Sequence, residues 1–222
     1  MDGAMSRALA LRAIQTTGIV PVIRTRSAEL ALRAASVLRE GGIDVLEVTM
    51  TVPDATQVIE ALVKRLGSAA WIGAGSVLDA DMARRCIDAG AQFLVSPGFD
   101  PELVRLGHAA DVAVAPGALT ATEVLAARAA GADLIKLFPC FAVGGARYVR
   151  ALRAPMPDVA FMPTGGISLA TLPEYFAAGA FAVGIGGELV DEALLSSGEE
   201  RKVVERARQY VAAVRIARHP QS

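Results

Sequence analysis

The stretch Ala130-Gly-Ala-Asp-Leu-Ile-Lys-Leu-Phe-Pro139 contains the unit from which the fold is built. A glycine that suits the end of a helix is followed by an apolar run with the length and composition of a buried strand. Similar junctions occur at Gly41-Gly42-Ile43, Ala89-Gly90-Ala91 and Ala178-Gly179-Ala180. A chain that repeats helix, glycine and apolar strand predicts a parallel sheet that is covered by helices on its faces.

The repeat predicts about eight strand and helix units, the number that closes a barrel. The expected strands are Ile19–Arg24, Val45–Thr49, Ala70–Ala74, Gln92–Ser96, Val112–Ala115, Leu134–Phe138, Val159–Pro163 and Phe181–Ile185. Helix starts are expected after Asp79, Thr120 and Ser168, whose side chains suit N-cap positions. An open, doubly wound sheet is the alternative. The short, regular repeat without a dinucleotide-binding fingerprint favours an α/β fold of the (β/α)8 TIM-barrel type.

Two further helices are expected outside the repeat. One, over Ser6–Thr17, precedes the first strand, and a charged amphipathic helix over Glu199–Arg218 ends the chain. No linker or composition shift divides the sequence, so residues 1–222 are predicted to form a single barrel domain.

Composition limits the classes of partner. Of the 222 residues, 53% are hydrophobic and only 20% charged, with a formal net charge of -1. This balance disfavours nucleic-acid and membrane partners, and no apolar run approaches the roughly 20 residues that span a bilayer. Excess apolar surface is expected in the core and in a subunit interface. The two cysteines, Cys86 and Cys140, predict no disulfide framework and suit the reducing cytoplasm.

Two ionisable residues lie inside apolar strands. Lys136 could keep a desolvated amine that attacks a ketone and forms a Schiff base, or it could reach solvent or pair with a carboxylate. Glu47, in Val45-Leu-Glu-Val-Thr49, could be that structural partner. A buried acid beside a buried amine is also what proton transfer at a carbon centre needs, so both roles stay open.

Other polar residues collect at the carboxyl ends of the predicted strands, where barrels carry their chemistry. Arg24 could hold a substrate carboxylate with two hydrogen bonds, or form a salt bridge to Glu47 or to a surface acid. Ser76 and Thr164 offer hydroxyl groups, with simple capping of the strand ends as the alternative.

Two glycine pairs, Gly165-Gly166 and Gly186-Gly187, follow the last two predicted strands. Loops at these two places often bind phosphate through backbone N–H groups, although tight turns also require glycine. His108 and His219 are isolated, and carboxylates do not cluster at the strand ends. We therefore expect neither a metal site nor a histidine triad, and no cofactor.

These residues lie in motifs whose order and spacing resemble the 2-keto-3-deoxy-6-phosphogluconate (KDPG) and 4-hydroxy-2-oxoglutarate (KHG) aldolase family over nearly the whole chain. The motifs are Val20-Pro-Val-Ile-Arg24, Leu46-Glu-Val-Thr-Met-Thr-Val-Pro53, Ile72-Gly-Ala-Gly-Ser-Val77, Ala91-Gln-Phe-Leu-Val-Ser-Pro-Gly98, Pro116-Gly117, Ile135-Lys-Leu-Phe-Pro139, Pro163-Thr-Gly-Gly-Ile167 and Val183-Gly-Ile-Gly-Gly187.

The resemblance implies a class I aldolase without cofactor, acting on a small 2-keto acid and usually trimeric. Lys136 matches the Schiff-base lysine and Glu47 the acid–base residue. Positions that line the pyruvate pocket are matched by Thr49, Ser76, Pro97, Phe138 and Thr164. The phosphate site is matched by Gly165, Gly166, Gly186 and Gly187.

The sequence departs from the family pattern in several places. Thr51 stands where some members carry an arginine, although members with this Thr-Val-Pro segment tend to have an arginine at the position of Arg24. Ser76 replaces the usual threonine. Gly187 stands where many members have a phosphate-binding serine, and Glu188 follows it. The missing hydroxyl at Gly187 and the added carboxylate of Glu188 weaken the expectation of a phosphate.

The reaction first expected is cleavage of KDPG to pyruvate and glyceraldehyde 3-phosphate. Cleavage of KHG to pyruvate and glyoxylate, or of 2-dehydro-3-deoxy-6-phosphogalactonate, are the alternatives. Two other classes remain open. One is an isomerase or epimerase that uses Glu47 and Lys136 as an ordinary acid–base pair. The other is a non-catalytic protein that binds sugar acids or phosphates on the same fold.

Overall fold

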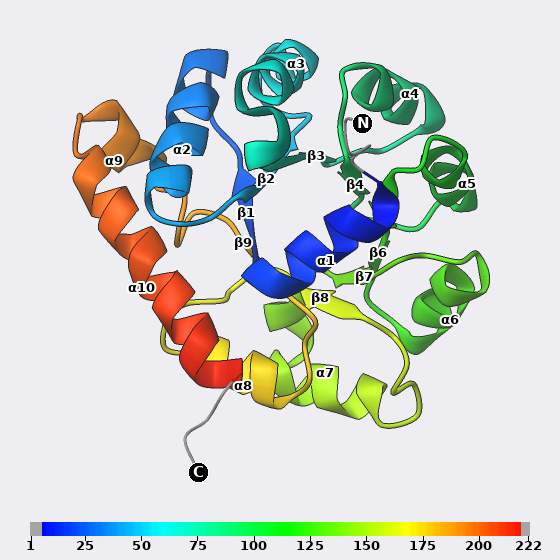
Figure 1. Ribbon diagram of the computed structural model, residues 1–222. Helices are drawn as coiled ribbons and strands as arrows, with labels where there is room; N and C mark the ends of the chain where they lie inside the picture. Colours follow the sequence, from blue (N-terminus) through cyan, green and yellow to red (C-terminus); the bar gives the residue numbers. More distant parts are fainter. Residues whose placement is uncertain (1–5, 219–222) are drawn as a thin grey trace.

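The computed structural model describes residues 6–218 and shows parallel strands that curl around a common centre, with helices outside them (Figure 1). The strands are β1 Ile19–Ile23, β2 Val45–Thr49, β3 Trp71–Gly75, β4 Phe93–Val95, β5 Ala113–Ala115, β6 Gly117–Ala118, β7 Ile135–Leu137, β8 Phe161–Pro163 and β9 Val183–Ile185. The helices are α1 Arg7–Thr17, α2 Ala28–Glu40, α3 Ala55–Leu66, α4 Ala80–Asp88, α5 Pro101–Ala109, α6 Ala121–Ala129, α7 Ala146–Arg153, α8 Leu172–Ala177, α9 Glu192–Ser196 and α10 Glu200–Arg218, with 3-10 turns at Gly67–Ala69 and Cys140–Val143.

The strands form two parallel sheets, a six-stranded one in the order β5-β4-β3-β2-β1-β9 and a three-stranded one in the order β6-β7-β8. Backbone contacts join the sheets on both sides. Thr164 and Gly184 form a bridge between the end of β8 and β9, and the Asp133 amide, just before β7, donates to the Val114 carbonyl of β5 at 3.2 Å. The result is a TIM-barrel-like curled sheet.

The strand expected over Val112–Ala115 differs from the prediction. It is interrupted at Pro116 and continues as β6, so that β5 pairs with β4 and β6 pairs with β7. Proline has no N–H to donate to a ladder, which accounts for the interruption. Its carbonyl still accepts a hydrogen bond from the strand that carries Lys136.

The signals for helix ends are confirmed with one exception. Glycines at the four repeated junctions adopt positive φ values, at Gly42, Gly90, Gly131 and Gly179. Asp79 caps α4, and Thr120 forms a capping box with Glu123 at α6. The prediction for Ser168 is wrong, because Ser168 to Thr171 form a turn that delays the start of α8 to Leu172.

Apolar side chains form two separate clusters. The larger one fills the space between the strands and the outer helices, and the smaller one lies inside the ring of strands. Alternate residues of a strand share one face, so Val45 and Leu134 in the inner cluster put Glu47 and Lys136 on the same inward face, two residues further on. The interior is therefore apolar toward the amino ends of the strands and ionisable toward their carboxyl ends.

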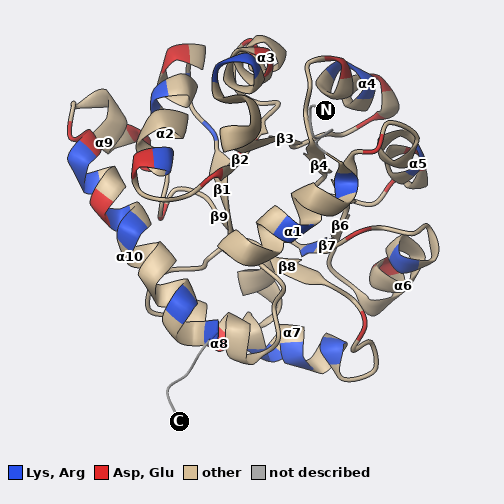
Figure 2. Cartoon of the chain, viewed as in Figure 1, with Lys and Arg blue, Asp and Glu red and all other residues tan. Residues whose placement is uncertain are grey.

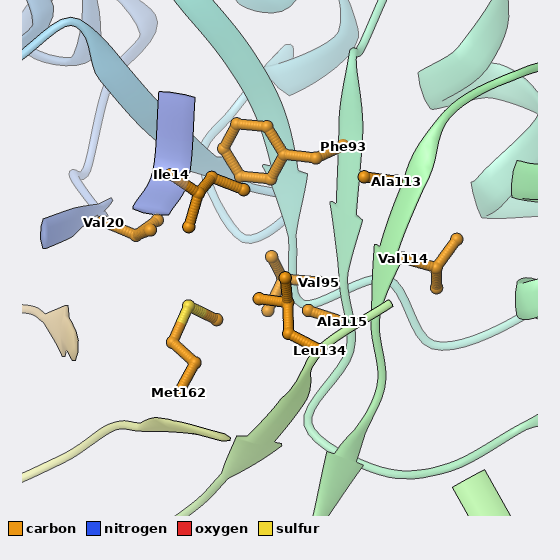
Figure 3. A pocket seen from close by; sticks show the side chains of 9 residues that line it. All are labelled: Ile14, Val20, Phe93, Val95, Ala113, Val114, Ala115, Leu134 and Met162. Carbon is orange, nitrogen blue, oxygen red and sulfur yellow. The ribbon is translucent and has the colours of Figure 1, made fainter. Parts of the chain in front are cut away.

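Helix α1 lies across the amino-end opening of the ring (Figure 1) and packs against β1, β2 and β5. Figure 3 shows Ile14 of this helix together with Val20, Phe93, Leu134 and Met162, which lie around the same small space. That space is too small for a water molecule and is lined by apolar side chains. This end of the ring is therefore filled by side chains, and chemistry belongs to the opposite end.

Charged residues of both signs are spread over the outer helices, and the strands are mostly uncharged (Figure 2). None of the helices between residues 6 and 218 combines the length and the apolar character required to cross a bilayer.

The apolar layer beneath the ionisable residues yields a prediction for stability. Ile14 is 2% exposed, and Ile14→Ala should lower the free energy of unfolding by about 2–4 kcal/mol, because it removes α1's contact with the interior. Ile216→Ala, at a position that is 71% exposed on α10, is the matched control and should stay within about 0.5 kcal/mol of wild type. Equal effects in denaturant titrations would contradict this account of α1.

Candidate active site

A cavity of about 520 Å³ lies at the carboxyl ends of the strands. Nine of the residues predicted for the site line it: Arg24, Ser76, Pro97, Lys136, Phe138, Thr164, Gly165, Gly186 and Gly187. Four other residues complete its wall, Val22, Val190, Asp191 and Glu192. Three predicted residues, Glu47, Thr49 and Gly166, are not part of this wall. The structure thus brings most of the predicted set together around one space.

Lys136 and Glu47 lie next to each other below the cavity, with exposed fractions of 5% and 1%. The Lys136 Nζ is 4.0 Å from the Glu47 Oε1. Neither carboxyl oxygen of Glu47 has a hydrogen-bond partner among the described residues. Buried polar atoms are rarely left this way, and the exceptions concentrate at functional sites. The lysine beside this carboxyl group lines the cavity, so the pair borders the space in which a ligand would lie.

Burial raises the pKa of the Glu47 carboxyl above its ordinary value of 4.5, and the nearby charges of Lys136 and Arg24 act in the opposite direction. The largest effect is desolvation, which disfavours the charged form of a carboxyl group. A carboxyl group whose pKa lies closer to neutrality can both donate and accept a proton in one reaction cycle.

Gly75 makes room for Glu47. A Cβ atom on Gly75 would lie 1.9 Å from the Glu47 Oε1, so a side chain there would displace the carboxyl group. The register pairs Glu47 with Gly73, and Thr49 with Gly75, on the neighbouring strand. No role for Gly75 was predicted from the sequence. The pattern that could have indicated this role is the pair of glycines at alternate positions of β3, beside the strand that carries the acid.

Thr49 takes a structural position. Its hydroxyl donates to the Ile23 carbonyl at 3.1 Å and lies 2.8 Å from the Thr51 hydroxyl. The side chain is fully buried and ties the end of β2 to β1. Its predicted contact with substrate stays a prediction.

Arg24 and Ser76 form a polar wall across the ends of β1 and β3. The Arg24 Nη2 donates to the Ser76 Oγ at 3.4 Å, and no salt bridge from Arg24 to Glu47 occurs among the described residues. Ser76 has a φ of 57°, an uncommon conformation for a residue other than glycine and one that concentrates at binding sites. The Phe138 ring lies on the other side of the amine, with its centroid 5.1 Å from the Lys136 Nζ.

The segment after β9 supplies wall residues that the sequence analysis missed. Asp191 caps α9, where its Oδ1 accepts hydrogen bonds from the amides of Ala193 and Leu194. Glu192 accepts a hydrogen bond from the Arg26 amide at 3.1 Å. In a sequence, an acid before a short helix is typical of an ordinary N-cap. No sequence pattern therefore predicts that these carboxylates line the cavity.

Several other side chains lie outside this wall. Cys140 is buried and its Sγ contacts the Gly145 carbonyl at 3.7 Å. Glu188 borders a neighbouring cavity, and His108 pairs with Asp133. His219 lies outside the described residues. Between residues 6 and 218, no three His, Cys, Asp or Glu side chains are grouped so that they could hold a metal ion.

Comparison with known proteins gives a consistent result. The family model for KDPG and KHG aldolase matches residues 11–206. The chain is 34% identical over 204 residues to the KHG/KDPG aldolase of Escherichia coli K12, covering 91% of this chain and 95% of that protein. It is 33% identical to the 2-dehydro-3-deoxy-6-phosphogalactonate aldolase of the same organism, over 77% of this chain and 83% of that one.

A solved structure agrees. The KDPG aldolase of Legionella pneumophila, with pyruvate captured as a covalent carbinolamine intermediate, superposes with a TM-score of 0.83 at 31% identity. The match covers 90% of this chain and 96% of that chain. A carbinolamine is the first covalent product of an amine and a ketone.

The raised pKa of Glu47 yields a prediction for stability against pH. Between pH 4.5 and the higher folded-state pKa, the unfolded chain loses the Glu47 proton and the folded chain keeps it. This group therefore lowers wild-type stability as the pH rises. Relative to wild type, Glu47→Gln should gain stability from pH 4.5 to pH 7.5, as measured by urea titration at each pH. Glu60→Gln, at an exposed position on α3, is the control and should show a flat difference. A difference that falls with pH for Glu47→Gln would contradict the assignment.

Proposed function

The chain belongs to the KDPG and KHG aldolase family, and we propose that Lys136 carries its Schiff-base chemistry with Glu47 as the group that moves protons. Members of this family are aldolases, so the chain is a lyase that breaks a carbon–carbon bond. The observation that supports the assignment most strongly is the buried pair itself, an amine 4.0 Å from an acid whose two oxygens accept no hydrogen bond from residues 6–218.

The proposed reaction begins when the Lys136 amine attacks the C2 ketone of a 2-keto-3-deoxy-4-hydroxy acid. The carbinolamine takes a proton from Glu47 on its hydroxyl and loses water, which leaves a protonated imine. Glu47, now a carboxylate, accepts the proton of the C4 hydroxyl. The C3–C4 bond then breaks, and its electron pair moves into the imine to form an enamine and an aldehyde.

The cycle closes when the enamine is protonated and the imine is hydrolysed. The enamine takes a proton at C3 from Glu47, water adds to the resulting imine, and pyruvate leaves as the free Lys136 amine is restored. The imine is itself the electron sink, so these steps call on no metal or organic cofactor. Because one carboxyl group donates and accepts protons in turn, a pKa raised toward neutrality suits Glu47 to the role.

The remaining site residues are proposed to bind the substrate. Arg24, placed by its hydrogen bond to Ser76, would hold the C1 carboxylate. Pro97, Phe138 and Thr164 would enclose the pyruvate part, and Thr49 would support that wall from behind. The glycine pairs Gly165-Gly166 and Gly186-Gly187 would border the part of the substrate that leaves as the aldehyde.

The aldehyde part decides which acid is cleaved. KDPG stays the first substrate expected from the resemblance, with glyceraldehyde 3-phosphate as its second product. The names of similar proteins also include KHG and 2-dehydro-3-deoxy-6-phosphogalactonate. All three acids share the keto and hydroxyl groups on which Lys136 and Glu47 would act.

The finer description of the fold belongs to the same proposal. We infer that residues 1–222 form one closed (β/α)8 barrel with α1 as an additional N-terminal helix. The bridge between Thr164 and Gly184 and the hydrogen bond from the Asp133 amide to the Val114 carbonyl support closure. The free cysteines Cys86 and Cys140 are both buried, which suits a cytoplasmic location.

A homotrimer is proposed from the family resemblance. Large apolar side chains that are 50–63% exposed, at Leu78, Leu125 and Phe141, offer surface that an interface would cover. Sedimentation equilibrium should therefore give three times the 23.0 kDa mass of the chain. The mass of a single chain or of a dimer across micromolar concentrations would contradict a trimer.

The Schiff base itself yields a direct prediction. Borohydride reduction in the presence of pyruvate should attach one reduced pyruvate to Lys136 and abolish activity. The chain has only three lysines, Lys64, Lys136 and Lys202, so peptide mapping assigns the modified residue without ambiguity. Lys136→Ala should lose the adduct and reduce kcat about a thousandfold or more, because the covalent route is removed.

Two variants act as controls for this experiment. Lys64→Ala, at an exposed position on α3, should form the adduct like wild type. Glu47→Gln keeps the amine and should lower kcat by roughly 10²–10⁴-fold, the range for loss of a general acid–base group. Turnover without any adduct would instead favour an isomerase or epimerase, and ligand binding without turnover would favour a binding protein.

A further inference from the structure

The segment after β9 places two carboxylates on the cavity wall, Asp191 and Glu192. They lie at the side of the cavity that also carries Gly186 and Gly187, where phosphate was expected from the sequence. Among the residues of this wall, the positive charges come from Arg24 and Lys136 alone. The charge of the aldehyde end therefore depends on where those two cations point.

Neither cation is available to the aldehyde end. Lys136 is the proposed nucleophile and lies beside Glu47. Arg24 donates to Ser76 at the end of β3. In the sheet order β9-β1-β2-β3, Ser76 lies on the opposite side of β1 from the segment after β9. The Arg24 guanidinium is thus directed toward β3, and the two acids lie on the β9 side of the cavity wall.

The protein's own carboxylate already occupies the first turn of α9. The Asp191 Oδ1 accepts hydrogen bonds from the amides of Ala193 at 3.0 Å and of Leu194 at 3.2 Å. Backbone amides at the start of a helix commonly bind phosphate, and α9 is the helix that follows the last strand. With these donors occupied, a phosphate would meet a carboxylate in their place.

The nearest additional cations are paired with the same acids. Arg206 lies 3.4 Å from the Asp191 Oδ2, and the Arg26 Nε lies 3.3 Å from the Glu192 Oε1. Neither arginine contributes to the wall of this cavity. Both ion pairs are partly exposed to solvent, so each arginine offsets the charge of its carboxylate only in part, and each carboxylate keeps lone pairs that can accept further hydrogen bonds.

The rest of the wall beside these acids carries no charge. Gly165, Gly186, Gly187 and Val190 line it there. Gly187 has no hydroxyl to offer. Glycines, an apolar side chain and two carboxylates supply hydrogen-bond acceptors and apolar contact, and this part of the wall itself contains no cation for an anionic group.

We infer that the aldehyde end of the site takes an uncharged fragment with free hydroxyl groups and discriminates against phosphate and carboxylate groups. Asp191 and Glu192 accept hydrogen bonds from the substrate's hydroxyls, and they repel an anion at the same place. The substrate class is then the unphosphorylated 2-keto-3-deoxy sugar acids. This inference rests on the proposed aldolase function and replaces the phosphate that the glycine pairs suggest.

A matched pair of substrates tests it. Pyruvate release is measured from 2-keto-3-deoxygluconate and from its 6-phosphate, which differ only in the group at the far end. We expect kcat/KM to be at least about tenfold higher for the unphosphorylated acid, since a dianion next to two carboxylates is disfavoured. Equal values, or a preference for the phosphate, would overturn the inference.

Asp191→Asn tests the residue named. Asparagine keeps an acceptor for the amides of α9, so the helix start is preserved while the charge is removed. The variant should raise kcat/KM for the 6-phosphate about three- to tenfold, because repulsion falls and Arg206 loses its partner. The same loss of charge at an exposed position on α3, in Glu60→Gln, is the control and should leave the ratio of the two substrates unchanged. No rise in Asp191→Asn would remove Asp191 from the explanation.

The proposed function and this inference fail in different ways. Absence of both the borohydride adduct and pyruvate release would refute the aldolase assignment of Lys136. An adduct at Lys136, together with faster cleavage of the 6-phosphate or cleavage of neither acid, would leave the Schiff base intact and refute only the inference about the substrate.

Discussion

The site depends on the burial of Lys136 and Glu47 side by side at the carboxyl ends of the strands. Both groups are nearly inaccessible to water, and the Glu47 carboxyl group accepts no hydrogen bond from the described residues. Such a pair destabilises a fold relative to apolar residues of the same size. The surrounding structure must compensate for this cost. It does so with an apolar interior below the pair and a second apolar layer between strands and helices. Reactivity and rigidity thus arise from the same arrangement, because the packing that removes water also holds the two groups in place.

The geometry of a parallel strand explains why both groups occur at the same depth. Alternate residues point inward, so each strand that enters with an apolar side chain can present a functional one two residues later. Leu134 and Lys136 follow this rule, as do Val45 and Glu47. Small residues on neighbouring strands complete the arrangement. Gly75 leaves the space that the Glu47 carboxyl group occupies, so the acid on β2 requires a glycine on β3.

Sequence reasoning succeeded where a residue conflicts with its immediate surroundings. A lysine or a glutamate inside an apolar run is visible without a structure, and four of the strands follow the repeated glycine junctions. It failed where position depends on contacts between distant segments. Ser168 resembles an N-cap, but the turn it forms with Thr171 delays the helix. Asp191 also resembles an N-cap and is one, yet only the folded chain shows that this cap forms part of the cavity wall.

That double role of Asp191 shows how specificity can change while the reaction stays the same. The lysine and the acid belong to strands whose side chains are fixed by the interior packing, so the positions of the two groups cannot shift without moving that packing. The segment after β9 is anchored by buried Leu189, Val190 and Leu195, but the Asp191 side chain is partly exposed, and a cap on a short helix can be exchanged among Asp, Asn and Ser at little cost in stability. Each choice changes the charge that meets the departing aldehyde. In the proposed mechanism the curled sheet therefore separates two tasks in space, with bond cleavage assigned to the strands and the identity of the aldehyde to the cap of α9.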